Sequence, residues 1–148
     1  MPFTRVGTHV TVTAVAIVIA FASLQSQSPV AGVRSQCRGA DSASADLIGY
    51  ITELINTTDV QLAAMRDSIG LTGVSPSSLV LVTDKTTCAK AAAALDNLAN
   101  VQSSGRTVYV VQAGTSRYIV EDPNGTAGEH LMVWVYDSRF RLVQGIAR

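Results

Sequence analysis

The chain has 148 residues and carries 11 Lys and Arg residues against 11 Asp and Glu residues, so its formal net charge is zero. Charged residues make up 15% of the chain, where about 25% is usual, and apolar residues make up 47%. The neutral balance argues against a nucleic-acid-binding protein, and the low charge argues against a disordered chain. No apolar run suits a membrane protein with several spans, and the length suits one domain.

The N-terminal segment has the parts of an export signal. Arg5 precedes an uncharged stretch, residues 10–22, which ends in a small-residue A-x-A pattern. The sequence therefore predicts a signal peptide over residues 1–22 and a periplasmic or secreted mature protein. The uncharged stretch is shorter than the roughly 20 residues of a spanning helix, and the alternative is an uncleaved anchor that tethers the domain to the membrane.

The first part of the mature chain is predicted to be a flexible leader over residues 23–43, followed by one domain over residues 44–148. Apolar residues at spacings of three and four predict a helix over residues 45–56, with Ser42 or Ser44 as its cap.

A second helix is expected to start at a cap on Thr58 or Asp59 and to run through Ile69. Leu62, Met65 and Ile69 are predicted on its apolar face. Gly70 follows as its stop, because glycine is common just after a helix.

A short β-branched run, residues 79–83, is predicted to form a strand. The Ala-rich helix expected next covers residues 87–100 and is capped by Asp84 or Thr86. Its inward stripe includes Cys88.

Cys37 and Cys88 are the two cysteines of the chain. An exported protein with two cysteines most often pairs them, so the sequence predicts a structural disulfide. Free buried thiols, or a reactive Cys88 at a helix N-terminus, are the alternatives. Two distant thiols and His130 do not make a zinc set, so no metal or cofactor is expected.

The C-terminal part is predicted to consist of four strands, over residues 107–113, 116–121, 130–136 and 139–146. The loop between the second and third covers residues 122–128. Short turns force antiparallel neighbours, so the chain is predicted to be an α+β domain with helices packed on one face of a four-stranded meander. This layout is similar to cystatin-like and NTF2-like sheets, an analogy that transfers no function.

Candidate chemistry is sparse. Glu129 and His130 lie at a strand start and form the one candidate acid–base pair, with Glu121 or Asp122 nearby across the loop. A solvated turn is the simpler interpretation of these residues.

The aromatic side chains suggest a binding surface. Tyr109, Tyr118, Trp134 and Tyr136, together with Phe140, are candidates to line one face of the sheet and bind a ligand, although core packing is the simpler interpretation. Arg139 and Arg141 are two residues apart, so they share a face if that segment is a strand.

The sequence thus predicts a small exported, non-catalytic binding or interaction protein whose partner is a protein or a small molecule. No nucleic-acid partner is expected, and no stable membrane contact once the signal is cleaved. The alternatives are an exported enzyme that uses Glu129 and His130 or Cys88, and a membrane-tethered domain.

Overall fold

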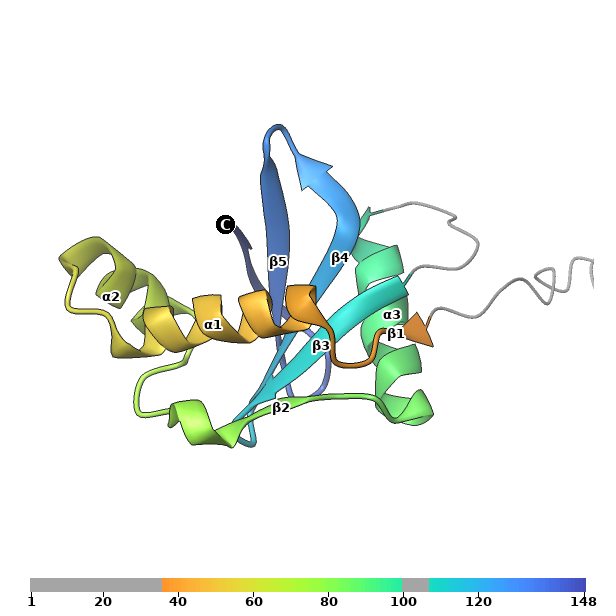
Figure 1. Ribbon diagram of the computed structural model, residues 1–148, viewed down its shortest axis with the longest axis horizontal. Coiled ribbons are helices and arrows are strands. Elements are labelled where there is room, and N and C mark those ends of the chain that lie inside the picture. The colour runs from red at the N-terminus through yellow and green to blue at the C-terminus, as the bar shows by residue number, and fades with distance from the viewer. Residues whose placement is uncertain (1–35, 100–106) are drawn as a thin grey trace, which may run out of the picture. The chain divides into compact units, whose positions relative to one another are not determined.

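A computed structural model describes residues 36–99 and 107–148 (Figure 1). The predicted signal peptide and most of the predicted leader lie outside the described residues. The elements in chain order are β1 (Gln36–Cys37), α1 (Ser42–Asn56), α2 (Val60–Ser68), the 3-10 helix η2 (Pro76–Ser78), β2 (Leu79–Leu81), α3 (Lys85–Ala99), β3 (Thr107–Ala113), β4 (Arg117–Ala127), β5 (His130–Asp137) and β6 (Leu142–Ala147). The predicted α+β class is confirmed.

The strands form one six-stranded sheet in the order β1-β3-β4-β5-β6, with β2 also paired to β3. Strands β3 to β6 follow one another as antiparallel neighbours, so the predicted meander is confirmed. The other edge of β3 is shared: β1 pairs with its first residues in parallel, and β2 pairs with its last residues in antiparallel. This strand is therefore central, which agrees with its largely buried side chains.

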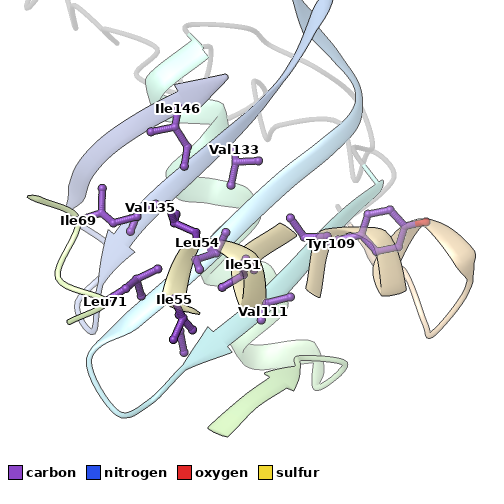
Figure 2. Close-up of a cluster of buried hydrophobic side chains, with 13 residues drawn as sticks. Ile51, Leu54, Ile55, Ile69, Leu71, Tyr109, Val111, Val133, Val135 and Ile146 are labelled. Atoms are coloured by element: carbon purple, nitrogen blue, oxygen red, sulfur yellow. The ribbon is translucent and has the colours of Figure 1, made fainter. Parts of the chain in front are cut away.

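Helices lie on both faces of the sheet, which corrects the prediction of helices on one face. Tyr109 and Val111 of β3 pack with α1 (Figure 2), whereas the alternate residues Val108 and Val110 pack with Leu95 of α3. Successive side chains of a strand point to opposite faces, so the two clusters are the two sides of the sheet. An apolar stripe predicts that a helix is covered but does not indicate which face it covers.

Helix α1 starts at Ser42, three residues before its predicted start, and its cap is Asp41 rather than Ser42 or Ser44. The Asp41 carboxylate accepts a hydrogen bond from Ser44 N at 2.9 Å, and Ser44 Oγ accepts one from Asp41 N at 2.9 Å. This reciprocal capping box satisfies amide groups that the first turn of a helix leaves unpaired.

Helix α2 is capped by Asp59, as predicted, and the chain turns at Gly70, whose φ of 76° suits glycine. Ile69 is buried, but Leu62 is 41% exposed, which corrects its expected place on a covered face. Among the described residues, no helix is long and apolar enough to cross a membrane.

The strand ends differ from the predictions at two places. Strand β4 continues to Ala127, through an irregularity between Glu121 and Thr126, where a loop was expected. Strand β6 starts at Leu142, so Arg139 and Arg141 lie in the turn that precedes it and do not share a strand face. Turn-forming residues are compatible with a bulged strand when a neighbouring strand supplies the pairing.

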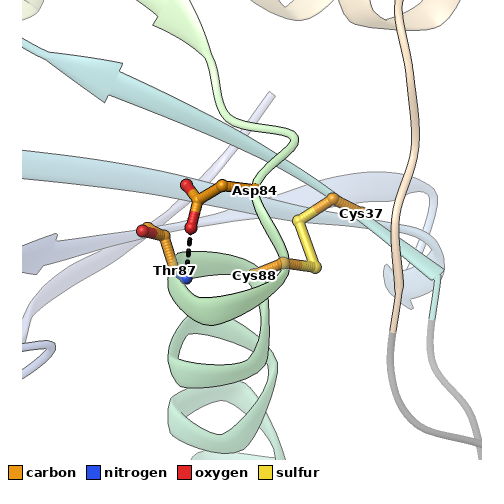
Figure 3. Close-up of a disulfide and its surroundings, with 4 residues drawn as sticks. All are labelled: Cys37, Asp84, Thr87 and Cys88. Atoms are coloured by element: carbon orange, nitrogen blue, oxygen red, sulfur yellow. Dashed lines mark hydrogen bonds between the residues drawn. A yellow bond between two sulfur atoms is a disulfide. The ribbon is translucent and has the colours of Figure 1, made fainter.

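The predicted disulfide between Cys37 and Cys88 is present and joins β1 to the first turns of α3 (Figure 3). Its sulfur atoms connect positions 51 residues apart in the chain. Asp84 caps α3, since its Oδ1 atom accepts a hydrogen bond from Thr87 N at 2.8 Å. The residues from Gln36 to Asp41, expected in the leader, therefore belong to the structured domain.

Candidate functional site

Four aromatic side chains gather on the α3 side of the sheet. Tyr136 belongs to the buried cluster there, and Tyr118, Trp134 and Phe140 pack against it while remaining half-buried. Tyr118 comes from β4, Trp134 and Tyr136 come from β5, and Phe140 comes from the turn before β6. Helix α3 packs chiefly against β1, β3 and β4, so β5 lies beyond its main contacts. We call these four side chains the aromatic surface.

Stacked rings form the part of the aromatic surface nearest the β5–β6 turn. The ring centroids of Tyr118 and Phe140 are 4.5 Å apart, with an angle of 19° between the ring planes. The Phe140 ring also lies 6.4 Å from the ring of Tyr136. Such offset or tilted pairs are the favoured arrangements of aromatic rings, so the turn is packed onto the sheet through Phe140.

The β5–β6 turn is built around one carboxylate. Asp137 Oδ1 accepts hydrogen bonds from the backbone N atoms of Arg139 and Arg141, each at 2.9 Å, and Asp137 Oδ2 pairs with Arg141 Nε at 2.7 Å. These hydrogen bonds and the guanidinium hold the pKa of Asp137 below its ordinary value. Phe140 has a φ of 56° in this turn, a conformation that bulky residues rarely adopt.

Gly145 makes room for the Trp134 indole. A side-chain Cβ at position 145 would lie 2.6 Å from Trp134 Cε3, far inside van der Waals contact. The strand opposite Trp134 therefore has to carry a glycine at this place, where β5 and β6 pair. Leu142, which pairs with Tyr136 across the same two strands, is 44% exposed and extends the apolar surface.

Tyr136 holds a buried hydroxyl group without a partner. Its side chain is 1% exposed, and no hydrogen-bond partner for its Oη atom exists in the part of the chain that the structure describes. Burial in this apolar cluster raises the pKa of Tyr136 to about 12. The hydroxyl is therefore protonated at neutral pH and able to donate a hydrogen bond.

Tyr109, the third tyrosine expected on a common face, lies on the opposite side of the sheet. It is fully buried beside α1 (Figure 2), and its hydroxyl donates to Asp41 Oδ2. Arg38 lies over its ring, with the guanidinium carbon 5.7 Å from the centroid. Tyr109 is thus part of the α1 core and is separated from the aromatic surface.

The hydroxyl of Tyr109 and the carboxylate of Asp41 perturb each other. The hydrogen bond from Tyr109, followed by that from Ser44 N, holds the pKa of Asp41 below its ordinary value. Burial, followed by the hydrogen bond to Asp41, raises the pKa of Tyr109.

The acid–base candidates are not assembled into a site. Glu129 and His130 are exposed at the start of β5, and no hydrogen bond or ion pair joins the side chain of either residue to another described side chain. Glu121, considered as a neighbour, is 1% exposed and pairs with Arg148. Asp122 accepts a hydrogen bond from Asn124 N at 2.9 Å.

The ion pair of buried Glu121 with partly buried Arg148 is a feature that the sequence analysis missed. Arg148 Nη2 and Nε donate to the two carboxylate oxygens of Glu121 at 2.9 and 3.2 Å. The guanidinium carbon of Arg148 lies 5.9 Å from the ring centroid of Tyr50 on α1. The sequence alone indicated that Glu121 faces the core, because alternation along β4 places it on the same face as buried Ile119. It did not indicate that Arg148 is the partner.

The remaining candidates for chemistry are the two cysteines and clusters of acidic side chains. Both cysteines are in the disulfide, so no free thiol exists for the reactive-Cys88 alternative. No group of three or more His, Cys, Asp and Glu side chains suited to a metal ion exists among the residues that the structure describes.

Comparisons with protein-family models, with curated proteins and with solved structures found no match to the chain. The geometry of the aromatic surface is therefore the basis for a functional conclusion.

Proposed function

We propose that the protein is a small exported, non-catalytic binding protein and that it binds its partner through the aromatic surface. The observation that carries this proposal is the set of half-buried rings of Tyr118, Trp134 and Phe140, beside the exposed Leu142. Half-buried aromatic side chains are over-represented where proteins bind partners, because they bury much apolar area at small entropic cost.

The surrounding charges favour binding over catalysis. Asp137 and Arg141, in the turn beside the aromatic surface, pair with each other, and Arg139 of the same turn is exposed. The acid–base candidates Glu129 and His130 are also solvated. A general acid or base needs a reacting atom and a positioned partner within hydrogen-bond reach. The likeness in layout to cystatin-like and NTF2-like sheets is an analogy and adds no weight to the proposal.

A binding assay with matched surface variants tests the proposal. Partners from culture medium or periplasmic extract are first retained on the immobilised protein and identified, and their affinities for purified variants are then measured. Leu142→Asp places a charge next to Tyr136, and we expect it to weaken binding at least about tenfold, since it adds a charge that binding would desolvate. Val60→Asp, at a position 82% exposed on α2, is the control and should bind like wild type.

Equal affinities of the two variants would contradict the use of this surface. A retained small molecule that is converted to a product would instead contradict the non-catalytic part of the proposal.

Export is the second part of the proposal. It is supported by the predicted signal over residues 1–22, and the disulfide of Cys37 and Cys88 is compatible with an oxidising compartment. N-terminal sequencing of the protein from an exporting host is expected to begin after Ala22. Recovery of the uncleaved chain in the membrane fraction would favour the tethered alternative.

A further inference from the structure

The hydroxyl of Tyr136 is the one buried side-chain polar atom that lacks a hydrogen-bond partner in the described parts of the chain. Tyr109 offers a direct comparison: it is equally buried, and Asp41 accepts its hydroxyl hydrogen. Folded proteins pair nearly all their buried polar groups, because an unpaired one costs its full desolvation. The position of the Tyr136 hydroxyl therefore does not serve the stability of the fold, and a role in binding would account for it.

The surroundings of Tyr136 restrict the charge of a ligand. Tyr136 packs among apolar and aromatic side chains, and burial is the one cause of its raised pKa, so no charge of the described residues acts on its hydroxyl. The nearest carboxylate along the chain, Asp137, is occupied by the turn amides and by Arg141. An ionised ligand group placed in this cluster would lose its hydration without gaining an opposite charge, so the complementary ligand is uncharged.

The surroundings also indicate which polar atom the ligand carries. The Tyr136 hydroxyl keeps its proton at neutral pH, because burial raises its pKa to about 12. A protonated hydroxyl can donate its hydrogen, and a carbonyl oxygen is an uncharged acceptor with two lone pairs.

Phe140 is the ring that connects Tyr118 to Tyr136. The Phe140 ring stacks on Tyr118 and lies beside Tyr136. The backbone of Phe140 itself has a φ of 56°. Strained backbone of this kind persists where the surrounding structure imposes it and is common at ligand clamps. Movement of this one ring would free a stacking face on Tyr118 and the side of the Tyr136 ring that lies toward Phe140.

We propose that the aromatic surface binds an uncharged molecule with a ring and a carbonyl group. The ligand ring replaces Phe140 against Tyr118, and the carbonyl oxygen accepts a hydrogen bond from Tyr136 Oη. This inference rests on the proposed function, and it specifies a ligand class for the same surface.

Two matched probes test the inference. Acetophenone and ethylbenzene share a ring and a carbon skeleton, and only acetophenone has the carbonyl oxygen. Their affinities are measured by NMR titration of the wild-type protein, following the indole N–H of Trp134, the single tryptophan of the chain. In Tyr136→Phe, we expect acetophenone to lose about 3- to 10-fold in affinity relative to ethylbenzene, the effect of one hydrogen bond.

Two control variants separate the hydroxyl and the ring from general effects. Tyr118→Phe removes a hydroxyl from the same surface and should leave the affinity ratio unchanged. Phe140→Gly suits the φ of 56° and removes the blocking ring, so it should bind acetophenone at least as tightly as wild type.

The outcomes distinguish the inference from the proposed function. An unchanged affinity ratio in Tyr136→Phe overturns the inference, and so does the failure of both probes to bind the wild type. Neither result affects the proposed function, which the Leu142→Asp experiment tests. Nuclear Overhauser contacts between the acetophenone methyl group and the Tyr118 ring in the wild type give a second readout that needs no variant, and their absence also contradicts the inference.

Discussion

At the scale of single residues, the two fully buried tyrosines differ in what their hydroxyl groups contact. Tyr109 donates to Asp41 at the start of α1, so its hydroxyl connects the sheet to the cap of a helix. The Tyr136 hydroxyl has no hydrogen-bond partner among the described residues. A buried hydroxyl with a partner stabilises the fold, whereas one without a partner lowers its stability. The same chemical change in the two residues should therefore have opposite effects.

We predict that Tyr136→Phe leaves the free energy of unfolding unchanged or raises it by up to about 1 kcal/mol at about pH 7, whereas Tyr109→Phe lowers it. Urea denaturation of the two variants and the wild type measures both effects. A loss of stability in Tyr136→Phe as large as that in Tyr109→Phe would mean that the Tyr136 hydroxyl does have a partner in the folded protein.

The Tyr136 hydroxyl also predicts a stability loss in alkali. The pKa of Tyr136 is raised from 10.0 to about 12 in the folded protein, so the unfolded chain loses this proton first. The contribution of Tyr136 to the free energy of unfolding is fully present below the pKa that it has in the unfolded chain. This contribution is lost as the pH rises through the pKa that it has in the folded protein. We expect wild type to lose more stability than Tyr136→Phe over this range, as measured by denaturation at a series of pH values. Parallel curves would contradict the raised pKa.

The contact of Asp41 with Tyr109 predicts the opposite pH dependence. The folded pKa of Asp41 lies below its ordinary value of 3.8, chiefly through the hydrogen bond from Tyr109. Stability from this group is present above the unfolded pKa and is lost as the pH falls through the folded pKa. The stability difference between wild type and Tyr109→Phe should therefore narrow in acid. A difference that stays constant on acidification would show that the carboxylate does not depend on this hydrogen bond.

At the scale of elements, short pieces of secondary structure depend on specific attachments. Strand β1 has two residues and pairs only with the start of β3, a length that has little stability of its own. The disulfide ties it to α3, and the hydrogen bond from Arg38 N to the carbonyl oxygen of Val108 continues the pairing at 2.8 Å. We infer that the disulfide holds this edge of the sheet in place.

Removal of the disulfide is expected to lower the free energy of unfolding by roughly 4 kcal/mol, from the entropy of a loop of this length. Comparison of the oxidised wild type with the Cys37→Ser, Cys88→Ser double variant in urea measures this change. Hydrogen exchange should show faster loss of protection at Arg38 N than at the amides between β4 and β5. Retained protection at Arg38 would show that β1 does not need the disulfide.

The packing of β5 against β6 predicts a contrast between two glycines. Gly145→Ala would drive a methyl group into the Trp134 indole, whereas Gly49, exposed within α1, has no atom within 4 Å of the place a Cβ would take. We expect Gly145→Ala to destabilise the protein and change the tryptophan emission. Gly49→Ala should raise stability by about 0.5–1 kcal/mol, because alanine favours helix. Unchanged emission in Gly145→Ala would contradict the position of the indole.

At the scale of the whole described domain, the two faces of the sheet have different roles. The α1 face holds the larger apolar cluster, together with the buried pair of Glu121 and Arg148. The other face is covered by α3 over β1, β3 and β4 and carries the aromatic surface farther along. We infer that the α1 face supplies most of the stability and that the α3 face leaves apolar side chains for a partner.

The sequence predicted the fold class, the meander and the disulfide because these follow from local patterns and short turns. It did not separate Tyr109 from Tyr118. A two-residue turn at residues 114–115 would have paired Tyr118 with Val111 and placed it on the face of Tyr109. The turn has three residues, Ala113 pairs with Arg117, and Tyr118 pairs with Gln112. One residue in a turn therefore moves a side chain to the other face, which no periodicity predicts.

Contacts between residues distant in sequence were also beyond prediction. The Tyr109 hydroxyl reaches Asp41 across 68 positions of the chain, and Glu121 meets Arg148 across 27. Each residue by itself resembles an ordinary strand or cap residue. The pairing becomes apparent only once the strand register and the place of α1 are known.

The central claim is that the aromatic surface binds the partner, and acrylamide quenching of Trp134 fluorescence tests it most directly. Trp134 is the single tryptophan of the chain and lies half-buried on this surface, so its quenching reports on the surface alone. The account predicts that a saturating partner or ligand lowers the quenching constant of the wild type severalfold. Saturated binding with unchanged quenching of Trp134 would contradict it.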